Sequence, residues 1–450
     1  MKPASSLRYP AALTVYAALL VWLAGLLPLW LDEVLTLIGA AKPSVHELMT
    51  WVAYNPGSSP LAFLIERPSI EALGLTRWGA RLPSMLFSVL AAISLLGFAR
   101  ELNLRRRALL VAVFLALPMQ LRYAVEARPY AAALFLTIAG LWCLWRLLDR
   151  PSWRLAVLYA VLVAGGLYMQ PFAAFVQIGA LAALALSSSK RAVLAAAAAL
   201  ALGCLLFAPW YAQVRLAWQQ EVVVSGYAGV LAWRTPLVLL REIAGGGYWQ
   251  SIPLILGAAL GWKELPAGVR RFLLGAILCG TLGAVAADAA SGYFFATRHA
   301  LFVIPALAVL ASAGFAANRY RRAGALLGAI FFVACIAKSS AYFRGGSEDW
   351  PGAARGLLNE ARKGSCLIVP QPEPEDLYAV FEPELRSHFC AATSAPGAVA
   401  MVVSRYSIPA RIKDTAAILA ARGLQPYGKV QLPGGVSLML YSVTARDAPN

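Results

Sequence analysis

Two adjacent carboxylates, Asp32 and Glu33, stand at the end of the first apolar stretch of the chain. An acid at the boundary between lipid and water is costly to keep there unless it is used or paired. A carboxylate in that position can take a proton from an incoming hydroxyl group. The alternative is that the two acids only mark the membrane boundary. We take Asp32 and Glu33 as candidate catalytic residues.

A second cluster is the segment RYAVEARPY, which begins at Arg122. Arg122 and Arg128 could anchor a hairpin at the membrane surface through a salt bridge with Glu126. They could also form a cationic pocket for a phosphate group, because the planar fork of arginine matches phosphate oxygens. Arg298-His299 is a third cluster, after a run of aromatic residues. Together these clusters suit chemistry on an anionic substrate linked to a lipid.

The candidate residues beyond the two acids fall into two groups. The phosphate-binding candidates are Arg122, Arg128, Arg298 and His299. The substrate-positioning candidates are Tyr123, Glu126 and Asn55. Arginines at a membrane boundary are also common as simple anchors, and a lone histidine beside an arginine is often structural.

The sequence offers little for a metal or a nucleotide cofactor. It contains no CxxC, HExxH, P-loop or GxGxxG motif, and its histidines, His46, His299 and His388, are scattered. We therefore expect that no cofactor is required. A divalent metal ion is conceivable but has no motif to support it.

The composition indicates which elements must hold these residues. The chain has 450 residues, of which 60% are hydrophobic and only 14% charged, and its net charge is +17. A soluble domain is about a quarter charged, so an ordinary soluble enzyme is excluded. The basic residues recur as small clusters between apolar runs, which excludes a continuous nucleic-acid-binding face. The chain is therefore a polytopic membrane protein.

The runs without charged residues give the expected membrane helices. The run 155–189 has 35 residues, too many for one crossing, and Gly165-Gly166 and Gln170-Pro171 near its middle mark a turn between two helices. We predict an all-α bundle with about eleven transmembrane helices. The runs are 9–31, 82–99, 108–121, 129–145, 155–189, 192–214, 243–262, 272–287, 299–318 and 323–337.

The positions of Lys and Arg predict the orientation of this bundle. With the N-terminus in the cytoplasm, the inner segments hold 17 Lys and Arg in 46 residues, and the outer segments hold ten in 109. Such an excess is the positive-inside pattern. A cleaved signal peptide over 1–31 is less favoured, because its apolar run is long and has no small-residue cleavage pattern. The outer segments, which contain the candidate residues, are 29–81, 122–128, 213–250 and 288–298.

The composition changes after the membrane domain, residues 1–341. Residues 342–450 read as a small α/β domain, which an odd number of spans places outside the cytoplasm. Its expected strands and helix are 366–369, 399–403, 436–443 and 410–421. Cys366 and Cys390 share this oxidising side, where they either form a disulfide or remain as thiols.

Taken in order, the motifs resemble a known family, the bacterial branch of the GT-C glycosyltransferases. Its relatives are the protein O-mannosyltransferases and the lipid A aminoarabinose transferases. The resemblance extends over about residues 8–355. The motifs are Trp30-Leu-Asp-Glu33, Arg81-Leu-Pro-Ser84, Tyr123-Ala-Val-Glu-Ala-Arg-Pro-Tyr130, Arg298-His299 and Glu348-Asp-Trp350.

This resemblance implies an inverting glycosyltransferase in the bacterial inner membrane. It would move a sugar from a polyprenyl-phosphate donor to a lipid, glycan or protein hydroxyl group on the outer, periplasmic face. Asp32 matches the family's catalytic base, and Glu33 matches its acidic neighbour. Arg128 and Arg298 would stabilise the leaving phosphate, with Glu126 orienting Arg128 or touching the sugar.

The sequence departs from the family at two places. Family members often have tyrosine where His299 stands, and a His-Pro-Pro run where this chain has residues 55–60, NPGSSP. Two other classes of protein also fit a polytopic chain. One is a transporter or flippase, which would be expected to show internal repeats that this chain lacks. The other is a non-catalytic scaffold for envelope assembly.

Overall fold

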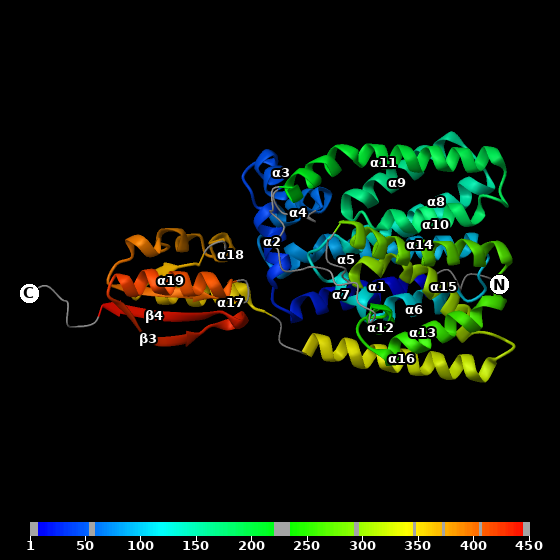
Figure 1. The fold of residues 1–450 in the computed structure, drawn as a ribbon. Helices are drawn as coiled ribbons and strands as arrows, with labels where there is room; N and C mark the ends of the chain where they lie inside the picture. The colour runs from blue at the N-terminus through cyan, green and yellow to red at the C-terminus, as the bar shows by residue number, and fades with distance from the viewer. Residues whose placement is uncertain are drawn as a thin grey trace, which may run out of the picture.

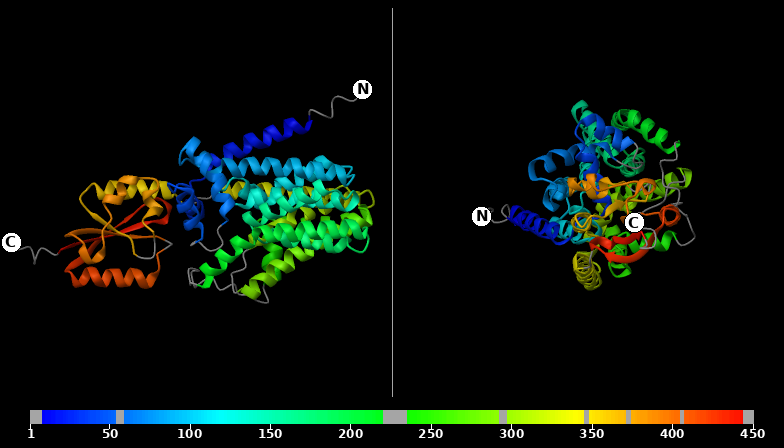
Figure 2. Two further views of the ribbon diagram at one scale, coloured as in Figure 1. Left: turned by 90° about the horizontal axis from the view of Figure 1, so that it is seen from above. Right: turned by 90° about the vertical axis from the view of Figure 1, so that its left-hand side faces the viewer.

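The protein consists of a bundle of helices and a small domain with a β-sheet at one end of it (Figure 1). The view from above shows the same end-to-end arrangement (Figure 2, left). The computed structural model describes residues 8–53, 59–219, 235–291, 297–344, 348–370, 374–404 and 407–443. The predicted division into a helical membrane part and a smaller C-terminal α/β part agrees with this arrangement.

The bundle is built from helices α1 to α16, which differ widely in length. Short helices α2, α3 and α4 connect α1 to α5 at the end next to the small domain (Figure 1). Short 3-10 helices, η1 Trp262–Glu264 and η2 Thr297–Val303, precede α14 and α15. The bounds are α1 Arg8–Leu26, α2 Leu31–Ala40, α3 Val45–Ala53, α4 Pro60–Leu73, α5 Arg77–Glu101, α6 Arg107–Ala116, α7 Pro118–Ala124, α8 Tyr130–Asp149, α9 Trp153–Met169, α10 Ala173–Leu184, α11 Lys190–Gln219, α12 Thr235–Glu242, α13 Tyr248–Gly261, α14 Ala267–Ser291, α15 Ile304–Phe315 and α16 Arg321–Arg344.

The apolar helices identify a multi-pass membrane protein. Among the described residues, six helices are long and apolar enough to cross a membrane, or seven if α6 and α7 form one span. Helices α9 and α10 and the segment Leu301–Phe315 are apolar but shorter. We expected about eleven spans, and each of them overlaps a helix of the bundle or, for 108–121, the bent pair of α6 and α7. The number of helices that cross the bilayer stays a prediction.

Two interruptions of the helices fall at prolines. Helices α9 and α10 separate at Gln170-Pro171, as expected, whereas Gly165-Gly166 lies inside α9. Helices α6 and α7 form a pair bent by 72°. Pro118, the first residue of α7, has no N–H to continue the helical ladder and favours the extended backbone that Leu117 adopts. Because of this bend, the short apolar run 108–121 changes direction before it reaches the segment RYAVEARPY, which begins at Arg122.

The core of the bundle depends on close contacts between helix backbones. A Cβ atom on Gly179 of α10 would lie 2.0 Å from the carbonyl oxygen of Gly275 on α14. A Cβ atom on Gly314 of α15 would lie 1.8 Å from the carbonyl oxygen of Gly257 on α13. Small residues are typical of such contacts between membrane helices. Glycine is therefore required at these crossings.

The small domain contains a four-stranded sheet in the order β1-β2-β4-β3. β1 is parallel to β2, and the other pairs are antiparallel. The three expected strands and the expected helix are present, but β3 was not expected. Its Pro426 and Gly428 disfavour a strand, and the register shifts between them at this edge of the sheet. The bounds are β1 Cys366–Ile368, β2 Ala398–Val403, β3 Leu424–Gln431, β4 Ser437–Val443, α17 Trp350–Ala361, α18 Asp376–Ala379 and α19 Pro409–Ala421.

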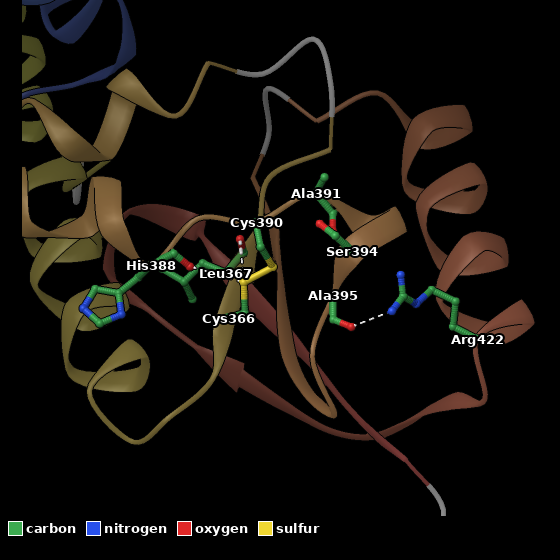
Figure 3. Close-up of a disulfide and its surroundings, with 8 residues drawn as sticks. All are labelled: Cys366, Leu367, His388, Cys390, Ala391, Ser394, Ala395 and Arg422. Atoms are coloured by element: carbon green, nitrogen blue, oxygen red, sulfur yellow. Dashed lines mark hydrogen bonds between the residues drawn. A yellow bond between two sulfur atoms is a disulfide. The ribbon is translucent and has the colours of Figure 1, made fainter.

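A disulfide joins Cys366 of β1 to Cys390 (Figure 3). Of the two states that the sequence left open, the structure has the bonded one. The backbone beside the disulfide is also paired, because Leu367 N–H donates to the carbonyl oxygen of His388 and Cys390 N–H donates to that of Leu367, both at 2.9 Å. The disulfide therefore fastens residues 388–390 along β1.

The small domain contacts the bundle through α2. Trp350 is buried in one apolar cluster with Leu31, the first residue of α2. A carboxylate oxygen of Glu348 accepts hydrogen bonds from Leu31 N–H at 3.1 Å and from the Trp350 indole at 2.8 Å. Lys42, just after α2, pairs with Asp376 at 3.0 Å. The helix that carries the two candidate acids is thus held from the side of the small domain.

Replacing both Cys366 and Cys390 by alanine is expected to destabilise the small domain. The bond closes a loop over a sequence separation of 24, and a loop of that length contributes about 3 kcal/mol through chain entropy. Thermal unfolding and limited proteolysis of the purified full chain measure the effect. Cys204→Ala, which removes an exposed thiol of the bundle, is the control. Unchanged protease sensitivity of the small domain in the double variant would contradict the expectation.

Candidate active site

A buried ion pair between Glu33 and Arg81 forms the centre of the site. Arg81 donates from Nη2 and Nε to the two carboxylate oxygens at 2.6 and 2.8 Å, and both side chains are almost fully buried. The guanidinium also donates to the carbonyl oxygens of Ala24, Leu27 and Pro28, beside the end of α1, at 2.6 to 3.0 Å. A buried charge is tolerated when it is partnered in this way.

Glu33 also holds two backbone segments. One carboxylate oxygen accepts from Ala127 N–H at 2.8 Å, and the other accepts from Trp30 N–H at 3.2 Å. The side chain has no exposed surface. Its oxygens are turned into the protein and are occupied by Arg81 and the backbone, and its place among the catalytic candidates stays a prediction.

Asp32 and Arg128 meet because each is the chain neighbour of a residue held at this centre. Arg128 Nη2 lies 3.8 Å from Asp32 Oδ2, and the two side chains are 20% and 25% exposed. Arg128 Nη1 also donates to the backbone carbonyl of Asp32 at 3.3 Å. Burial lowers the pKa of Arg128, but the charge of Asp32, together with Tyr130 and Glu126, more than offsets this, so the net pKa is raised. A solvent-accessible carboxylate and a permanent cation thus share one site.

Arg298 belongs to the same electrostatic group. Burial lowers its pKa, and the acidic groups of Tyr130, Tyr123 and Asp32 more than offset this, while Arg128 acts in the lowering direction. Such influences act between groups that lie close together. Asp32 and Arg128, which come from distant parts of the chain, are thus in contact, and Arg298 lies near enough for its charge to interact with both.

His299 packs against an aromatic ring. Its imidazole stacks on Phe172, with ring centroids 4.1 Å apart and planes 13° apart, and it is buried. Phe172 directly precedes α10, so this contact joins η2 to the start of that helix. The stacking gives His299 a structural contact, and its expected role at the donor phosphate stays a prediction.

A second ion pair, between Arg122 and Glu126, lies at the end of α7. The two side chains meet at 2.6 Å, and Tyr342 of α16 donates its hydroxyl to Glu126 at 3.1 Å. Burial raises the pKa of Glu126, although Arg122 acts in the opposite direction. Glu126 thus pairs with Arg122. Our expectation that it orients Arg128 or touches the sugar stays a prediction. The Arg122 guanidinium also lies 5.2 to 5.6 Å from three ring centroids, those of Trp30, Tyr123 and Tyr342.

A cavity of about 440 Å³ opens beside this second pair. Its charged lining is mostly basic: Arg122, Arg241 and Lys338 against one acid, Glu242. Glu242 pairs with Arg241 at 2.6 Å. Tyr123 lines the same cavity and lies 4.4 Å from Tyr130, ring centroid to ring centroid. Tyr123 therefore lies between this cavity and Tyr130, and both tyrosines influence the pKa of Arg298.

Glu66 of α4 is a buried acid that the sequence analysis missed. It is 4% exposed, and its Oε1 has no hydrogen-bond partner within the part of the chain that the structure describes. Burial raises its pKa well above the usual range, and the charge of Glu33 adds to this. The available signal was a single acid after the apolar run 61–65 within an outer segment.

The sequence analysis also did not single out several other residues near the site, and one of its candidates is not among the residues that the structure describes. Arg81 entered the sequence analysis only as part of a motif, and Arg241 and Lys338 did not enter it. Asn55 lies outside the described residues. Across those residues, no group of three or more His, Cys, Asp or Glu side chains could hold a metal ion. The expectation that no metal is required stays a prediction.

Comparisons with known proteins address the fold. Residues 57–213 match the sequence model of a family described as dolichyl-phosphate-mannose-protein mannosyltransferase. No curated protein matches the chain. The structure is similar to that of ArnT from Cupriavidus metallidurans in the apo state, with a TM-score of 0.65 at 13% identity. The similarity covers 97% of this chain and 98% of that one.

Two further solved structures hold a lipid phosphate. One is ArnT from Cupriavidus metallidurans bound to undecaprenyl phosphate, with a TM-score of 0.55, 15% identity and coverage of 98% of this chain and 99% of that one. The other is the oligosaccharyltransferase AglB from Archaeoglobus fulgidus with an inhibitory peptide and a dolichol-phosphate, with a TM-score of 0.56 and 11% identity. It covers 99% of this chain and 75% of that one.

These likenesses define the class of protein. The chain has the fold of the GT-C glycosyltransferases, over nearly its full length. The resemblance that its motifs suggested is confirmed at this level by the match over 57–213 and by the solved structures.

Replacing Glu33 by glutamine is expected to destabilise the protein strongly. The change removes the only charge that the structure places against the buried Arg81 guanidinium within 4 Å among the described residues, and such a loss costs about 3 to 5 kcal/mol. Thermal unfolding in detergent measures it. Glu71→Gln, which removes an exposed partner of Arg67, is the control and should cost about 0.5 kcal/mol or less. Equal effects of the two changes would refute the central role of the Glu33 pair.

Proposed function

We propose that the protein is an inverting glycosyltransferase that uses a polyprenyl-phosphate sugar as donor. The acceptor is a hydroxyl group of an envelope lipid, glycan or protein. The observation that carries the proposal is the Asp32–Arg128 pair, with its side chains 3.8 Å apart and both partly exposed. A base and a cation in contact fit a reaction that takes a proton and releases a phosphate.

In the proposed reaction, Asp32 accepts the proton of the acceptor hydroxyl. The freed oxygen attacks the anomeric carbon from the side opposite the phosphate, so one bond forms as the carbon–phosphate oxygen bond breaks. This single displacement inverts the anomeric configuration. Negative charge grows on the departing polyprenyl phosphate, and Arg128 and Arg298 stabilise it. A positioned base supplies about 10²- to 10⁴-fold of the acceleration.

The basic cavity supports a lipid phosphate as the donor's anchor. Arg122, Arg241 and Lys338 line it, and an anion entering it meets more positive than negative charge. The structures of ArnT with undecaprenyl phosphate and AglB with a dolichol-phosphate share the fold. We propose that the headgroup of the donor enters from this cavity and reaches Arg128 and Arg298 past Tyr123.

Glu33 serves this scheme as a positioning residue. It touches Ala127, the neighbour of Arg128, and is itself the neighbour of Asp32, so it sets the distance between base and cation. We further propose that the protein lies in the bacterial inner membrane. Its N-terminus would be cytoplasmic, and the active site and small domain would face the periplasm.

The substitution Asp32→Asn tests the proposed base. It keeps the size of the side chain and removes the proton acceptor, so kcat should fall at least about 100-fold while the protein still inserts in the membrane. Transfer from labelled polyprenyl-phosphate sugars in membranes measures the loss. Asp149→Asn, an exposed acid at the other end of α8, is the control and should keep normal activity.

Normal transfer in membranes that contain the Asp32→Asn variant would contradict the enzymatic scheme. A non-catalytic scaffold predicts that the substitution has no effect, since its role needs no base. A transporter predicts movement of the labelled lipid with no glycosidic product. The anomeric configuration of an isolated product decides whether transfer inverts.

The substitution Arg128→Gln tests the stabilisation of the leaving phosphate. Because the charge acts mainly as the bond breaks, kcat should fall about 100-fold, more than KM rises. Steady-state kinetics with a donor series measures both constants. Arg154→Gln removes an exposed arginine at the start of α9 and should leave both constants unchanged. A change in KM alone would assign Arg128 to simple donor binding.

A further inference from the structure

Glu66 and Arg128 line one small cavity between α4, α5 and the loop before α8. The cavity leaves about 10 Å³ for the centre of a water molecule, which is close to the least that one ordered water needs. Its polar lining consists of Thr36, Glu66, Ser84 and Arg128. The remainder of the lining is mostly apolar, so these four groups decide what the cavity can hold.

The two charged residues of this cavity complement each other. Arg128 Nε is a buried donor and Glu66 Oε1 a buried acceptor, and each lacks a hydrogen-bond partner in the described part of the chain. The hydroxyls of Thr36 and Ser84 donate to the carbonyl oxygens of Asp32 and Arg128, at 3.0 and 3.2 Å. Their own oxygens remain able to accept. One water there could accept from Arg128 Nε and donate to two of the three oxygens, which gives it three polar partners, the usual number for a buried water.

We propose that Glu66 is a positioning residue for Arg128, and that one water held in this cavity links its carboxyl group to Arg128 Nε. The link rests on the proposed function for its purpose, since it aims the guanidinium at Asp32 and the substrate phosphate. The Nη1 and Nη2 atoms of Arg128 then stay available on the Asp32 side, while the water binds Nε on the opposite side. A bridging water is nearly as good a partner as a direct hydrogen bond.

The charge of Glu66 matters for this role. Burial raises its pKa well above the usual range, and the charge of Glu33 adds to this, so both influences favour the neutral form of the carboxyl group. The adjacent Arg67 does not pair with it, because Arg67 binds Glu71 and the carbonyl oxygen of Pro43. A neutral acid orients Arg128 without cancelling the positive charge that the phosphate needs.

The first arm of the test does not depend on the proposed function. Glu66→Gln keeps shape and polarity without ionising. The infrared difference spectrum between wild type and this variant at neutral pH should contain the carbonyl stretch of one protonated carboxylic acid. Glu71→Gln on the same helix is exposed and ion-paired and should lack that band. A carboxylate band in place of the acid band for Glu66 would overturn the proposal.

The second arm measures Arg128 through its ligand, with undecaprenyl phosphate as the probe. Glu66→Leu should weaken binding of the probe about tenfold and lower kcat, because the water loses its acceptor. Glu66→Gln should restore both to within about twofold, whereas a role that needs a negative charge would not be rescued by the neutral amide. Glu71→Leu is the matched control and should bind as wild type does.

The outcomes separate two kinds of failure. If Glu66→Leu binds the probe as tightly as wild type, or if Glu66→Gln is as weak as Glu66→Leu, Glu66 does not position Arg128. If wild type itself does not bind undecaprenyl phosphate, the proposed function fails, and the infrared arm still decides the state of Glu66. A water seen between Glu66 and Arg128 in an experimental map would support the link, and an apolar contact there would overturn it.

Discussion

The buried pair of Glu33 and Arg81 is the interaction on which the site depends. Arg81 joins the end of α1 to α2, and Glu33 joins α2 to the loop before α8 through Ala127. Neither charge could stay buried alone, so the four segments must meet. Asp32 is the chain neighbour of Glu33, and Arg128 is the chain neighbour of Ala127, whose N–H donates to Glu33. Their separation follows from a contact that neither of them makes.

The surroundings reinforce the same helix. Glu348 accepts the Leu31 N–H from the side of the small domain, and Trp350 fills an apolar cluster with α2. The proposed base, Asp32, is therefore carried on a short helix fixed at both sides, and its side chain is partly open to solvent. Rigid support of this kind suits a group that must meet a hydroxyl and an anomeric carbon at once. It also gives the motif Glu348-Asp-Trp350 a structural meaning.

Part of the site could be predicted from the sequence because it depends on local patterns. Acids and arginines at the ends of apolar runs marked Asp32, Arg128 and Arg298, and the structure brings these three together. The roles of Glu33 and Glu126 were not predictable, since an acid in a motif looks the same whether it faces a substrate or a buried arginine. Glu66 belongs to no motif, and only its burial and missing partner distinguish it from a boundary acid.

By itself the sequence determined the membrane class, the apolar helices, the C-terminal α/β domain and most of its strands. These follow from charge-free runs and periodicity, which act over a few residues and need no knowledge of neighbours. Only the tertiary structure decided which charges are paired, which carboxylate stays open and which residues share a cavity. Those properties depend on contacts between segments as distant as Leu31 and Glu348, and no local pattern encodes the distance between two side chains.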